Sequence, residues 1–190
     1  GSPRGAVRPV MDLGALKTVR LRLDPIVPHV AEELWEATGA SLPELRAWMW
    51  WADQATPDST REFAEEAERL REEGMSYQFV IRDDAGVAGA GGVEIHGAER
   101  RIGEVGYWIR TDRTGLGYAT EAVRAVVDFA FAELGLYRLE LRAGVENRAS
   151  QRVAEKAGFR REGRLRQGCA HGQAGYDCYL FGLLVTDPRS

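Results

Sequence analysis

The residues best able to do chemistry lie in one stretch, from Gly103 to Phe131. A strand-like run from Glu104 to Arg110 leads into a turn that holds Gly115 and Gly117. A long helical pattern begins near Tyr118. A strand, a glycine turn and a helix in this order point several backbone N–H groups and the positive end of a helix dipole at one spot. We therefore expect this turn to hold the phosphates of a cofactor.

Two familiar phosphate-binding motifs do not fit this turn. The dinucleotide fingerprint G-x-G-x-x-G requires a third glycine, where this chain has Thr120. A P-loop requires Lys and Ser or Thr after its last glycine, where the chain has Tyr118 and Ala119. Dinucleotide binding and nucleotide hydrolysis are therefore not expected. What remains is a backbone cradle that can hold a pyrophosphate without an obligatory metal.

Length and composition favour one globular domain. The chain has 190 residues, of which 44% are apolar and 28% charged, and this is enough to bury a full core. We expect a single domain over residues 16–186, preceded by a flexible arm over residues 1–15 and followed by a tail over residues 187–190.

Charge, hydropathy and cysteine content limit the kinds of partner and the cellular compartment that we expect for this protein. The net charge of −4, with acidic and basic residues interspersed, argues against nucleic acid as a partner. No apolar run approaches the roughly 20 residues that a membrane span needs. Cys169 and Cys178 lack the spacing of metal ligands and are expected to be reduced thiols. We expect a soluble, cytoplasmic protein with no bound metal.

The elements that must position the central stretch follow from sequence periodicity. Val19 to Leu23 alternates apolar and basic residues, as a half-buried strand would. Capping residues and apolar spacing predict three helices, over residues 28–39, 41–51 and 59–74. The first cap expected is Ser41 with Glu44, and the second is Ser59 with Glu62. Three strands with tight turns are then expected as an antiparallel meander, over residues 77–81, 87–96 and 102–110.

The C-terminal third mixes strands with one further helix. After the central helix, strands are expected over residues 138–142, 159–164 and 176–184. Asn147 is a good N-cap for a helix over Arg148 to Ala157. Leu165 to Gly175, with three glycines, is expected to be a mobile loop. A meander combined with a helical crossover predicts an α+β fold with a mixed sheet.

Four segments together closely resemble the GNAT N-acetyltransferases, and most of all the branch typified by the ribosomal-protein N-terminal acetyltransferases of the Rim type. They are Glu104–Arg110, Gly115–Ala122, Glu146–Ser150 and Ala154–Phe159. The resemblance covers about residues 16–186. It implies the GNAT fold, with a mixed, mostly antiparallel central sheet of about seven strands and helices on both faces. It also implies an acyltransferase that uses acetyl-CoA, acetylates a primary amine and releases CoA.

The resemblance also implies where acetyl-CoA binds. Its pyrophosphate would lie on the N–H groups of the glycine turn, namely those of Thr114, Gly115, Leu116, Gly117, Tyr118, Ala119 and Thr120. Its pantetheine arm would pair with the strand backbone at Tyr107, Trp108, Ile109 and Arg110. Gly117 and Ala119 match the family signature R/Q-x-x-G-x-G/A, but Thr114 stands at the Arg/Gln position. This departure leaves the backbone cradle intact and puts a side-chain phosphate contact in question.

A second family pattern, N-x-x-S, matches Asn147 and Ser150. In the family the amide reaches the pantetheine and the hydroxyl lies near the thioester sulfur. Lys156 is a further candidate to contact a cofactor phosphate, or it is a solvated helix lysine.

Acetyl transfer to an amine needs a neutral nucleophile, a proton or hydrogen bond for the departing thiolate, and donors for the oxyanion. Direct attack in a ternary complex needs no covalent enzyme intermediate. Glu104 is the candidate base, through water, or it is a surface carboxylate. Ser150 is the candidate acid at the sulfur, or it is a helix first-turn hydroxyl. A backbone N–H between Trp108 and Arg110 is the candidate oxyanion donor.

The acceptor site is expected to include Trp48, Trp51, Tyr176 and Asp177. Trp48, Trp50 and Trp51 lie too close in sequence to share one helical face, so at least one is expected to line an opening. Tyr176 is also an alternative acid or a core residue, and Asp177 is equally a structural hydrogen-bonding residue. The acceptor is either a protein N-terminal α-amine or a small-molecule amine such as an antibiotic or polyamine, and the chain is a monomer or a homodimer. The alternative function is a non-catalytic acyl-CoA-binding or interaction module on the same fold.

Overall fold

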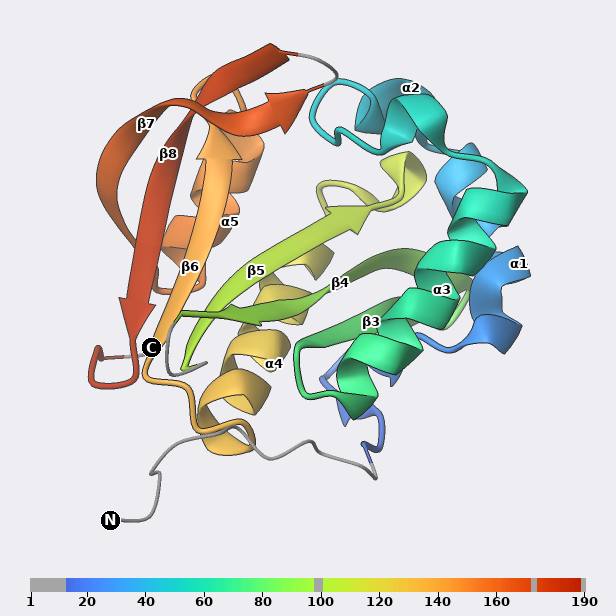
Figure 1. The fold of residues 1–190 in the computed structure, drawn as a ribbon, viewed down its shortest axis with the longest axis horizontal. Coiled ribbons are helices and arrows are strands. Elements are labelled where there is room, and N and C mark those ends of the chain that lie inside the picture. Colours follow the sequence, from blue (N-terminus) through green and yellow to red (C-terminus); the bar gives the residue numbers. More distant parts are fainter. Residues whose placement is uncertain (1–12, 98–100, 172–173, 189–190) are drawn as a thin grey trace.

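The computed structural model describes residues 13–97, 101–171 and 174–188. Its centre is one sheet of eight strands in the order β1-β2-β3-β4-β5-β6-β8-β7. Helices cover both faces of this sheet (Figure 1). The expected α+β architecture is confirmed, with one strand more than predicted.

The strands are β1 (Leu16–Lys17), β2 (Arg22–Pro25), β3 (Ser76–Asp83), β4 (Gly86–His96), β5 (Ile102–Ile109), β6 (Arg138–Gly144), β7 (Arg160–His171) and β8 (Ala174–Leu184). The α-helices are α1 (Ala31–Gly39), α2 (Leu42–Leu45), α3 (Pro57–Glu72), α4 (Tyr118–Ala132) and α5 (Arg148–Lys156). Three 3-10 helices connect them, η1 (Pro28–Val30), η2 (Ala52–Gln54) and η3 (Thr111–Arg113).

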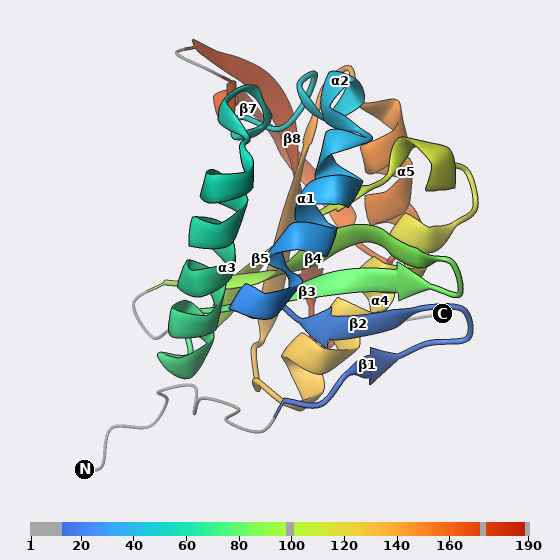
Figure 2. The same ribbon diagram turned by 90° about the vertical axis from the view of Figure 1, so that its right-hand side faces the viewer.

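Two apolar cores hold the layers together, one on each face of the sheet. On one face the apolar stripe of α4 packs on β3, β4 and β5, where the Phe129 ring stands edge-on to those of Tyr77 and Phe79. On the other face α1 and α3 pack over residues that include Val80 and Trp108. In Figure 2, α1 and α3 lie on one side of the strands and α4 lies on the other. The helices therefore leave part of the second face, over β5 and β6, uncovered (Figure 1).

The central strands diverge at one point, and this creates an opening in the sheet. β5 pairs with β4 along its whole length. It pairs in parallel with β6 over three residues only, from Ile102 opposite Arg138 to Glu104 opposite Glu140. Beyond Glu104 the two strands separate (Figure 1). The edge of β5 that faces β6 is then without a strand partner among the described residues, as the resemblance to GNAT enzymes implies.

The strand predicted over Val19 to Leu23 is wrong, because these residues form the turn between β1 and β2 and the start of β2. Thr18 N–H donates to Leu21 O (2.9 Å) and closes this turn. Val19 stands at the tip with 97% of its surface exposed. The alternating pattern failed because Arg20 is drawn to an ion-pair partner on α4 rather than to solvent beside a strand.

The early helices begin and end differently from the prediction. The expected helix over residues 41–51 is reduced to α2, and the Ser41 hydroxyl does not cap it but accepts the Thr111 N–H (3.0 Å). In α3 the cap is Thr56, whose side chain accepts the Ser59 N–H, so the helix starts before the predicted residue 59. In both cases the serine hydroxyl has another hydrogen-bond partner.

The mobile loop predicted over Leu165 to Gly175 is also wrong, because β7 and β8 run through most of it. Gly168 and Gly175 belong to an irregular strand pair whose register shifts between Leu165 and Cys169. Gln167 takes a positive φ of 50° there, and its N–H donates to Asp177 Oδ1 (2.9 Å). Residues 172–173 lie outside the described residues.

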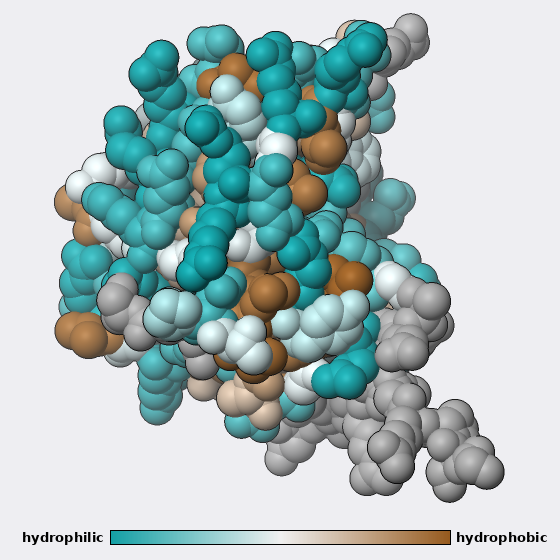
Figure 3. All heavy atoms as spheres, turned by 90° about the vertical axis from the view of Figure 1, so that its left-hand side faces the viewer, coloured by the Kyte–Doolittle hydropathy of each residue, from teal (hydrophilic) through white to brown (hydrophobic). Residues whose placement is uncertain are grey.

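β7 is one of the two edge strands of the sheet, and its exposed residues include four arginines, Arg160, Arg161, Arg164 and Arg166. Figure 3 shows that hydrophilic residues cover most of this side of the molecule. Charged side chains on an edge strand discourage pairing with another sheet.

Other expectations fall partly outside the described residues. The predicted arm (residues 1–15) is described only from Leu13, and the tail (187–190) only to Pro188. No described helix is long and apolar enough to span a membrane. The described ranges bring no three His, Cys, Asp or Glu side chains together as a metal site would need.

Candidate active site

The glycine turn before α4 forms a cradle of backbone N–H groups. Gly115 and Gly117 have φ of 78° and 82°, in the left-handed region that L side chains rarely adopt. Gly117 is the N-cap of α4, and no side chain caps the helix. The N–H groups of Tyr118, Ala119 and Thr120 have no acceptor within the helix, because the first helical hydrogen bond runs from Glu121 N–H to Gly117 O (3.1 Å). They are therefore available to an anion, with the helix dipole behind them.

The side chains that flank the cradle are engaged elsewhere. Both the N–H (3.3 Å) and Oγ1 (2.8 Å) of Thr114 donate to Thr111 O, so the predicted Thr114 N–H does not belong to the cradle. Arg113 is held by Asp83 (2.9 Å) and Asp112 (3.1 Å). In this structure neither residue supplies a side-chain donor to the cradle, which consists of backbone groups.

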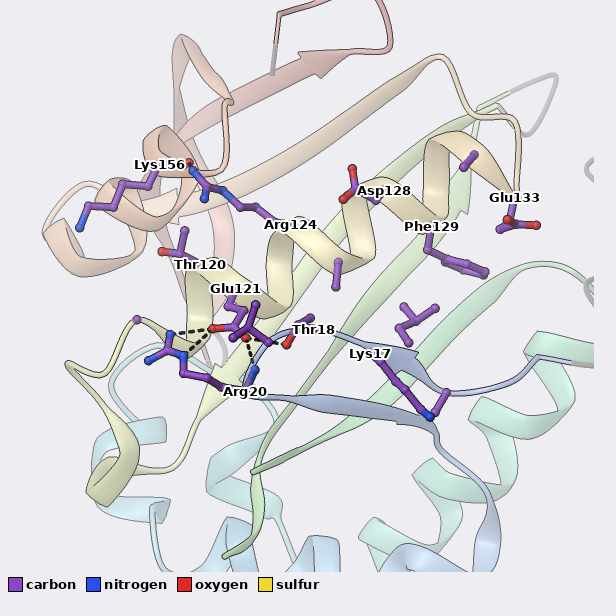
Figure 4. A pocket seen from close by; sticks show the side chains of 16 residues that line it. Lys17, Thr18, Arg20, Thr120, Glu121, Arg124, Asp128, Phe129, Glu133 and Lys156 are labelled. Atoms are coloured by element: carbon purple, nitrogen blue, oxygen red, sulfur yellow. Dashed lines mark hydrogen bonds and ion pairs between the residues drawn. The ribbon is translucent and has the colours of Figure 1, made fainter. Parts of the chain in front are cut away.

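The β1–β2 turn braces the first turn of α4 (Figure 4). Arg20 forms an ion pair with Glu121 (2.6 Å) and donates from Nη1 to Leu116 O (2.8 Å). Its guanidinium also lies over the Tyr118 ring, 5.0 Å from the centroid. Burial alone would raise the pKa of Glu121, but hydrogen bonds from Thr18 and Arg20 outweigh it and lower the pKa. The brace fixes the position of the helix start without using its N–H groups.

A groove of about 970 Å³ runs from the cradle along α4, between this helix and the β1–β2 turn (Figure 4). Gly117 and Thr120 lie at one end of it, and Glu133 lies at the other. Its lining includes the basic residues Lys17, Arg20, Arg124 and Lys156. Neither Glu104 nor Ser150 lines this groove, so it adjoins the cradle but not the predicted catalytic residues.

The backbone of β5 presents alternate N–H groups to the opening beside β6. Arg110 N–H, just after β5, donates to Ala88 O on β4 (2.8 Å). Hydrogen bonds alternate along an antiparallel pair, so the Trp108 N–H also points to β4. The N–H groups of Tyr107 and Ile109 point toward β6, which has already diverged there. Of the strand residues expected to bind pantetheine, these two have N–H groups facing the opening.

The start of α5 meets β5 across the same opening. Asn147 Oδ1 accepts the Ser150 N–H (3.1 Å) and caps the helix, as its residue type predicted. Tyr107 Oη donates to Ser150 Oγ (3.2 Å). Burial raises the pKa of the Tyr107 phenol, and the Ser150 hydrogen bond opposes this rise. The Tyr107 hydroxyl is a site group that the sequence did not single out, because nothing local links it to Ser150.

Glu104 lies on the face of β5 opposite to Tyr107, because strand side chains alternate. Burial raises the pKa of Glu104, and Arg142 and then His96 oppose this rise. Arg142 Nη1 lies 3.4 Å from Glu104 Oε2. The predicted base and the predicted acid therefore flank the opening from opposite faces of the sheet.

An aromatic wall lies over the end of β6 on the Glu104 side. The Trp48 and Tyr176 rings stand edge to face at 6.2 Å, and Tyr176 Oη donates to Trp48 O (3.1 Å). A Cβ added to Gly144 would lie 2.9 Å from the Tyr176 ring and 3.0 Å from the Trp48 ring, so both pack on this glycine. Burial raises the pKa of Tyr176 to about 12. Tyr176 thus stays protonated at neutral pH.

Comparison with known proteins identifies the family. A family model described as "Acetyltransferase (GNAT) domain" matches residues 20–160 of this chain. The chain belongs to the GNAT acetyltransferase family. YdaF of Bacillus subtilis (strain 168), which bears the name of a ribosomal N-acetyltransferase, is 30% identical over 184 residues, covering 90% of this chain and 92% of YdaF. Members of this family are acyl-CoA-dependent N-acetyltransferases.

Solved structures agree with this GNAT assignment. RimJ of Mycobacterium smegmatis, solved with a CoA disulfide, is 27% identical, with a TM-score of 0.78 over 87% of this chain and 82% of RimJ. RimL, a ribosomal α-N-protein acetyltransferase solved with coenzyme A, has a TM-score of 0.84 over 90% of this chain and 98% of RimL. RimL is 17% identical, so it supports the fold alone.

The two remaining residues predicted for the acceptor site of this GNAT chain are Trp51 and Asp177. Trp51 is half-buried against Trp108, at 6.4 Å between ring centroids, whereas Trp50 is 64% exposed. Asp177 points from β8 to the face opposite Tyr176, where it binds Arg164 (2.7 Å) and the Gln167 N–H (2.9 Å). Its contacts are structural, and it does not lie with the aromatic wall.

Lys156 ends α5, and its carbonyl oxygen accepts from Arg124 Nη2 (2.6 Å). Its side chain extends away from the groove in Figure 4, so the structure brings the lysine near the cradle without a contact to it.

Gly106 is a residue of the candidate site that the sequence analysis did not single out. It lies on β5 between Glu104 and Trp108, on the same face as both. A Cβ added there would meet no atom within 4 Å. We use the name acceptor face for the surface of Glu104, Gly106 and Trp108 with the Trp48–Tyr176 wall. A glycine in a strand signals close approach of another group, and this signal could have found it.

Proposed function

We propose that this chain transfers the acetyl group of acetyl-CoA to a primary amine by direct attack in a ternary complex. The observation that carries the proposal is the two-sided access to one opening between β5 and β6. Glu104 lies on the acceptor face, and the Tyr107–Ser150 pair lies on the face that carries α5. An amine that enters from the acceptor face would meet the base there, while the sulfur would leave toward the acid.

The cradle fits the diphosphate of the donor. Its N–H groups at the start of α4 have no side-chain cap, and its glycines hold the φ angles that the turn needs. The adjoining groove, with Arg20 and Arg124, supports placing the phosphorylated nucleoside of CoA on that side. Acetyl-CoA supplies the activated thioester, and the chain contributes binding, orientation and proton transfer.

The side chains at the opening suit the proton transfers. Its raised pKa makes Glu104 a better base near neutral pH than an exposed glutamate, and it would act on the amine through a water. The Ile109 N–H faces the opening and would stabilise the tetrahedral oxyanion. The Ser150 hydroxyl would donate to the sulfur as the carbon–sulfur bond breaks.

The acceptor is a primary amine at the end of a chain or on a small molecule. The open space above Gly106 and the Trp48–Tyr176 wall suit an extended acceptor that lies along the acceptor face. The name of YdaF as a ribosomal N-acetyltransferase supports a ribosomal acceptor, and a protein N-terminal α-amine is the first class that we propose. A small-molecule amine is the second class.

The test measures release of CoA thiol with acetyl-CoA and three probes: a peptide that begins with serine, one that begins with alanine, and spermidine. We expect turnover with at least one probe, and slower turnover by about 100-fold for Glu104→Gln and Ser150→Ala with little change in acetyl-CoA affinity. Glu65→Gln is the control, because Glu65 is an exposed residue of α3 and is not among the charges that act on the pKa of Glu104. Tight acetyl-CoA binding without turnover of any probe would favour the non-catalytic binding module.

A further inference from the structure

We propose that Tyr107 is a positioning residue, which aims the hydroxyl proton of Ser150 at the thioester sulfur. The inference rests on the proposed function, in which Ser150 is the donor to the sulfur. It concerns the Tyr107 side chain, whereas the family resemblance points only to the backbone of this residue.

The first step is the hydrogen-bond capacity of Ser150. A hydroxyl has one proton to donate and two lone pairs to accept with. Tyr107 Oη donates to Ser150 Oγ (3.2 Å) and so takes one lone pair. Within the described part of the chain, the Ser150 hydroxyl makes no other hydrogen bond. Its proton is therefore turned away from Tyr107 and is left to point into the opening between β5 and β6.

The second step is the direction of this bond. A phenol is a stronger hydrogen-bond donor than an alcohol, so the arrangement with Tyr107 as donor is favoured. Burial raises the pKa of Tyr107, which keeps the phenol protonated and able to donate. A tyrosine at this point therefore acts as a fixed donor rather than as a base.

The third step is rigidity at both ends of the bond. The Tyr107 ring packs against the core under α4. Its cross-strand neighbour is Gly91, and a Cβ added there would lie 2.9 Å from Tyr107 Cβ, so the missing side chain makes room for the tyrosine. The Ser150 backbone is fixed by the Asn147 cap (3.1 Å). Neither hydroxyl has to be ordered when acetyl-CoA binds, so the site is preorganised.

The test reads the hydrogen bond at the sulfur directly, with CoA as the probe. A donor to the sulfur stabilises the thiolate, so the pKa of the bound CoA thiol reports it. This pKa is measured from the ultraviolet absorbance of the thiolate during a pH titration. The proteins compared are wild type, Ser150→Ala, Tyr107→Phe and the double variant, with calorimetry to check that each binds CoA.

We expect Ser150→Ala to raise the thiol pKa by roughly half a unit to one unit. Tyr107→Phe should raise it by a similar or smaller amount. The double variant should match Ser150→Ala alone, because Tyr107 acts through Ser150. Tyr179→Phe is the matched control, since this half-buried tyrosine packs against the same core on β8, and it should leave the thiol pKa unchanged.

Each of the other possible results contradicts the inference. If Tyr107→Phe leaves the thiol pKa unchanged while Ser150→Ala raises it, the inference is wrong and the proposed function stands. If the two changes add in the double variant, Tyr107 acts on the sulfur itself and the positioning role is wrong. If wild-type protein binds no CoA, or Ser150→Ala has no effect on the thiol, the donor assignment fails and the inference fails with it.

Discussion

The cradle at Gly115 to Thr120 is made of consecutive backbone groups, whereas the acceptor face is made of side chains from segments far apart in the chain. Two glycines with positive φ shape the cradle, and the β1–β2 turn braces it. On the acceptor face, Trp48 and Tyr176 are 128 residues apart and meet over Gly144. Glu104 meets Arg142 only because β5 pairs with β6 at its start.

This difference has a physical consequence for substitution. A backbone site depends on the conformation of one short segment, so it is sensitive to glycine replacement and indifferent to most side-chain changes. A side-chain site depends on the packing of several elements, so it can be reshaped one residue at a time. The changes below test whether donor binding and acceptor use can be separated in this way.

Gly106→Leu should separate acceptor use from donor binding most strongly. The side chain would fill the open space on the acceptor face and displace an acceptor from the opening, while the cradle is untouched. We expect kcat/KM for the acceptor to fall by about 100-fold, with acetyl-CoA affinity within a factor of two or so. Steady-state kinetics with each substrate varied, together with calorimetry, measures both. Gly163→Leu on β7 is the control, because a Cβ there also meets no atom within 4 Å.

Gly117→Val should produce the reverse pattern. The steric clash would be small, since a Cβ would approach only Arg20 Nη2 at 3.4 Å, but a φ of 82° strains a β-branched residue. We expect acetyl-CoA affinity to fall by about 10- to 100-fold in calorimetry. Gly117→Asn should retain most of the affinity, because Asn tolerates this region better. Equal affinity for wild type and Gly117→Val would mean that the cradle does not bind the donor.

The pH dependence of the acceptor reaction should report Glu104. The base must be ionised, so kcat/KM should fall as the pH drops through the raised pKa of Glu104, at a higher pH than for an exposed glutamate. Arg142 lowers that pKa, so Arg142→Leu should move the acid limb to higher pH. Glu104→Gln should remove the limb. An acid limb at the same pH in all three proteins would assign it to another group, and Arg152→Leu on α5 is the charge control.

Gly144→Ala should alter the acceptor side more mildly. The added methyl would lie 2.9 Å from the Tyr176 ring and 3.0 Å from the Trp48 ring, so the wall must shift. We expect the acceptor KM to change by about 3- to 10-fold and the tryptophan fluorescence to change with it. Unaltered acceptor kinetics would show that the wall does not touch the acceptor.

Glu121→Ala should have the smallest effect of these changes, and it should lower the stability of the fold. It removes the acceptor for Thr18 and Arg20 and frees the β1–β2 turn from α4. Because Arg20 is half-exposed, we expect a loss of only about 1 kcal/mol in the free energy of unfolding by urea. Glu66→Ala, which breaks an exposed ion pair with Arg69 on α3, should cost less. A cost no larger than that of Glu66→Ala would mean that the brace contributes nothing to stability.

The sequence by itself determined the elements whose signals are local. The glycines at 115 and 117 marked a turn before a helix, and the structure has α4 starting at Tyr118 after two residues with positive φ. Asn147 marked the start of α5 for the same reason, since a capping side chain binds a backbone group three residues away. The meander over β3, β4 and β5 followed from alternation and turn residues.

Only the tertiary structure decided which side chains share the opening. Tyr107 and Ser150 are 43 residues apart, and their contact depends on how far β5 and β6 diverge. Tertiary contacts also explain two of the wrong predictions. Arg20 forms an ion pair with Glu121, so the segment Val19–Leu23 turns instead of running on as a strand. The β7–β8 pair accommodates its glycines through register shifts, so most of the predicted loop is strand. Local propensity encodes backbone conformation, whereas long-range pairing selects the side chains that meet, and a single sequence carries little direct signal for that pairing.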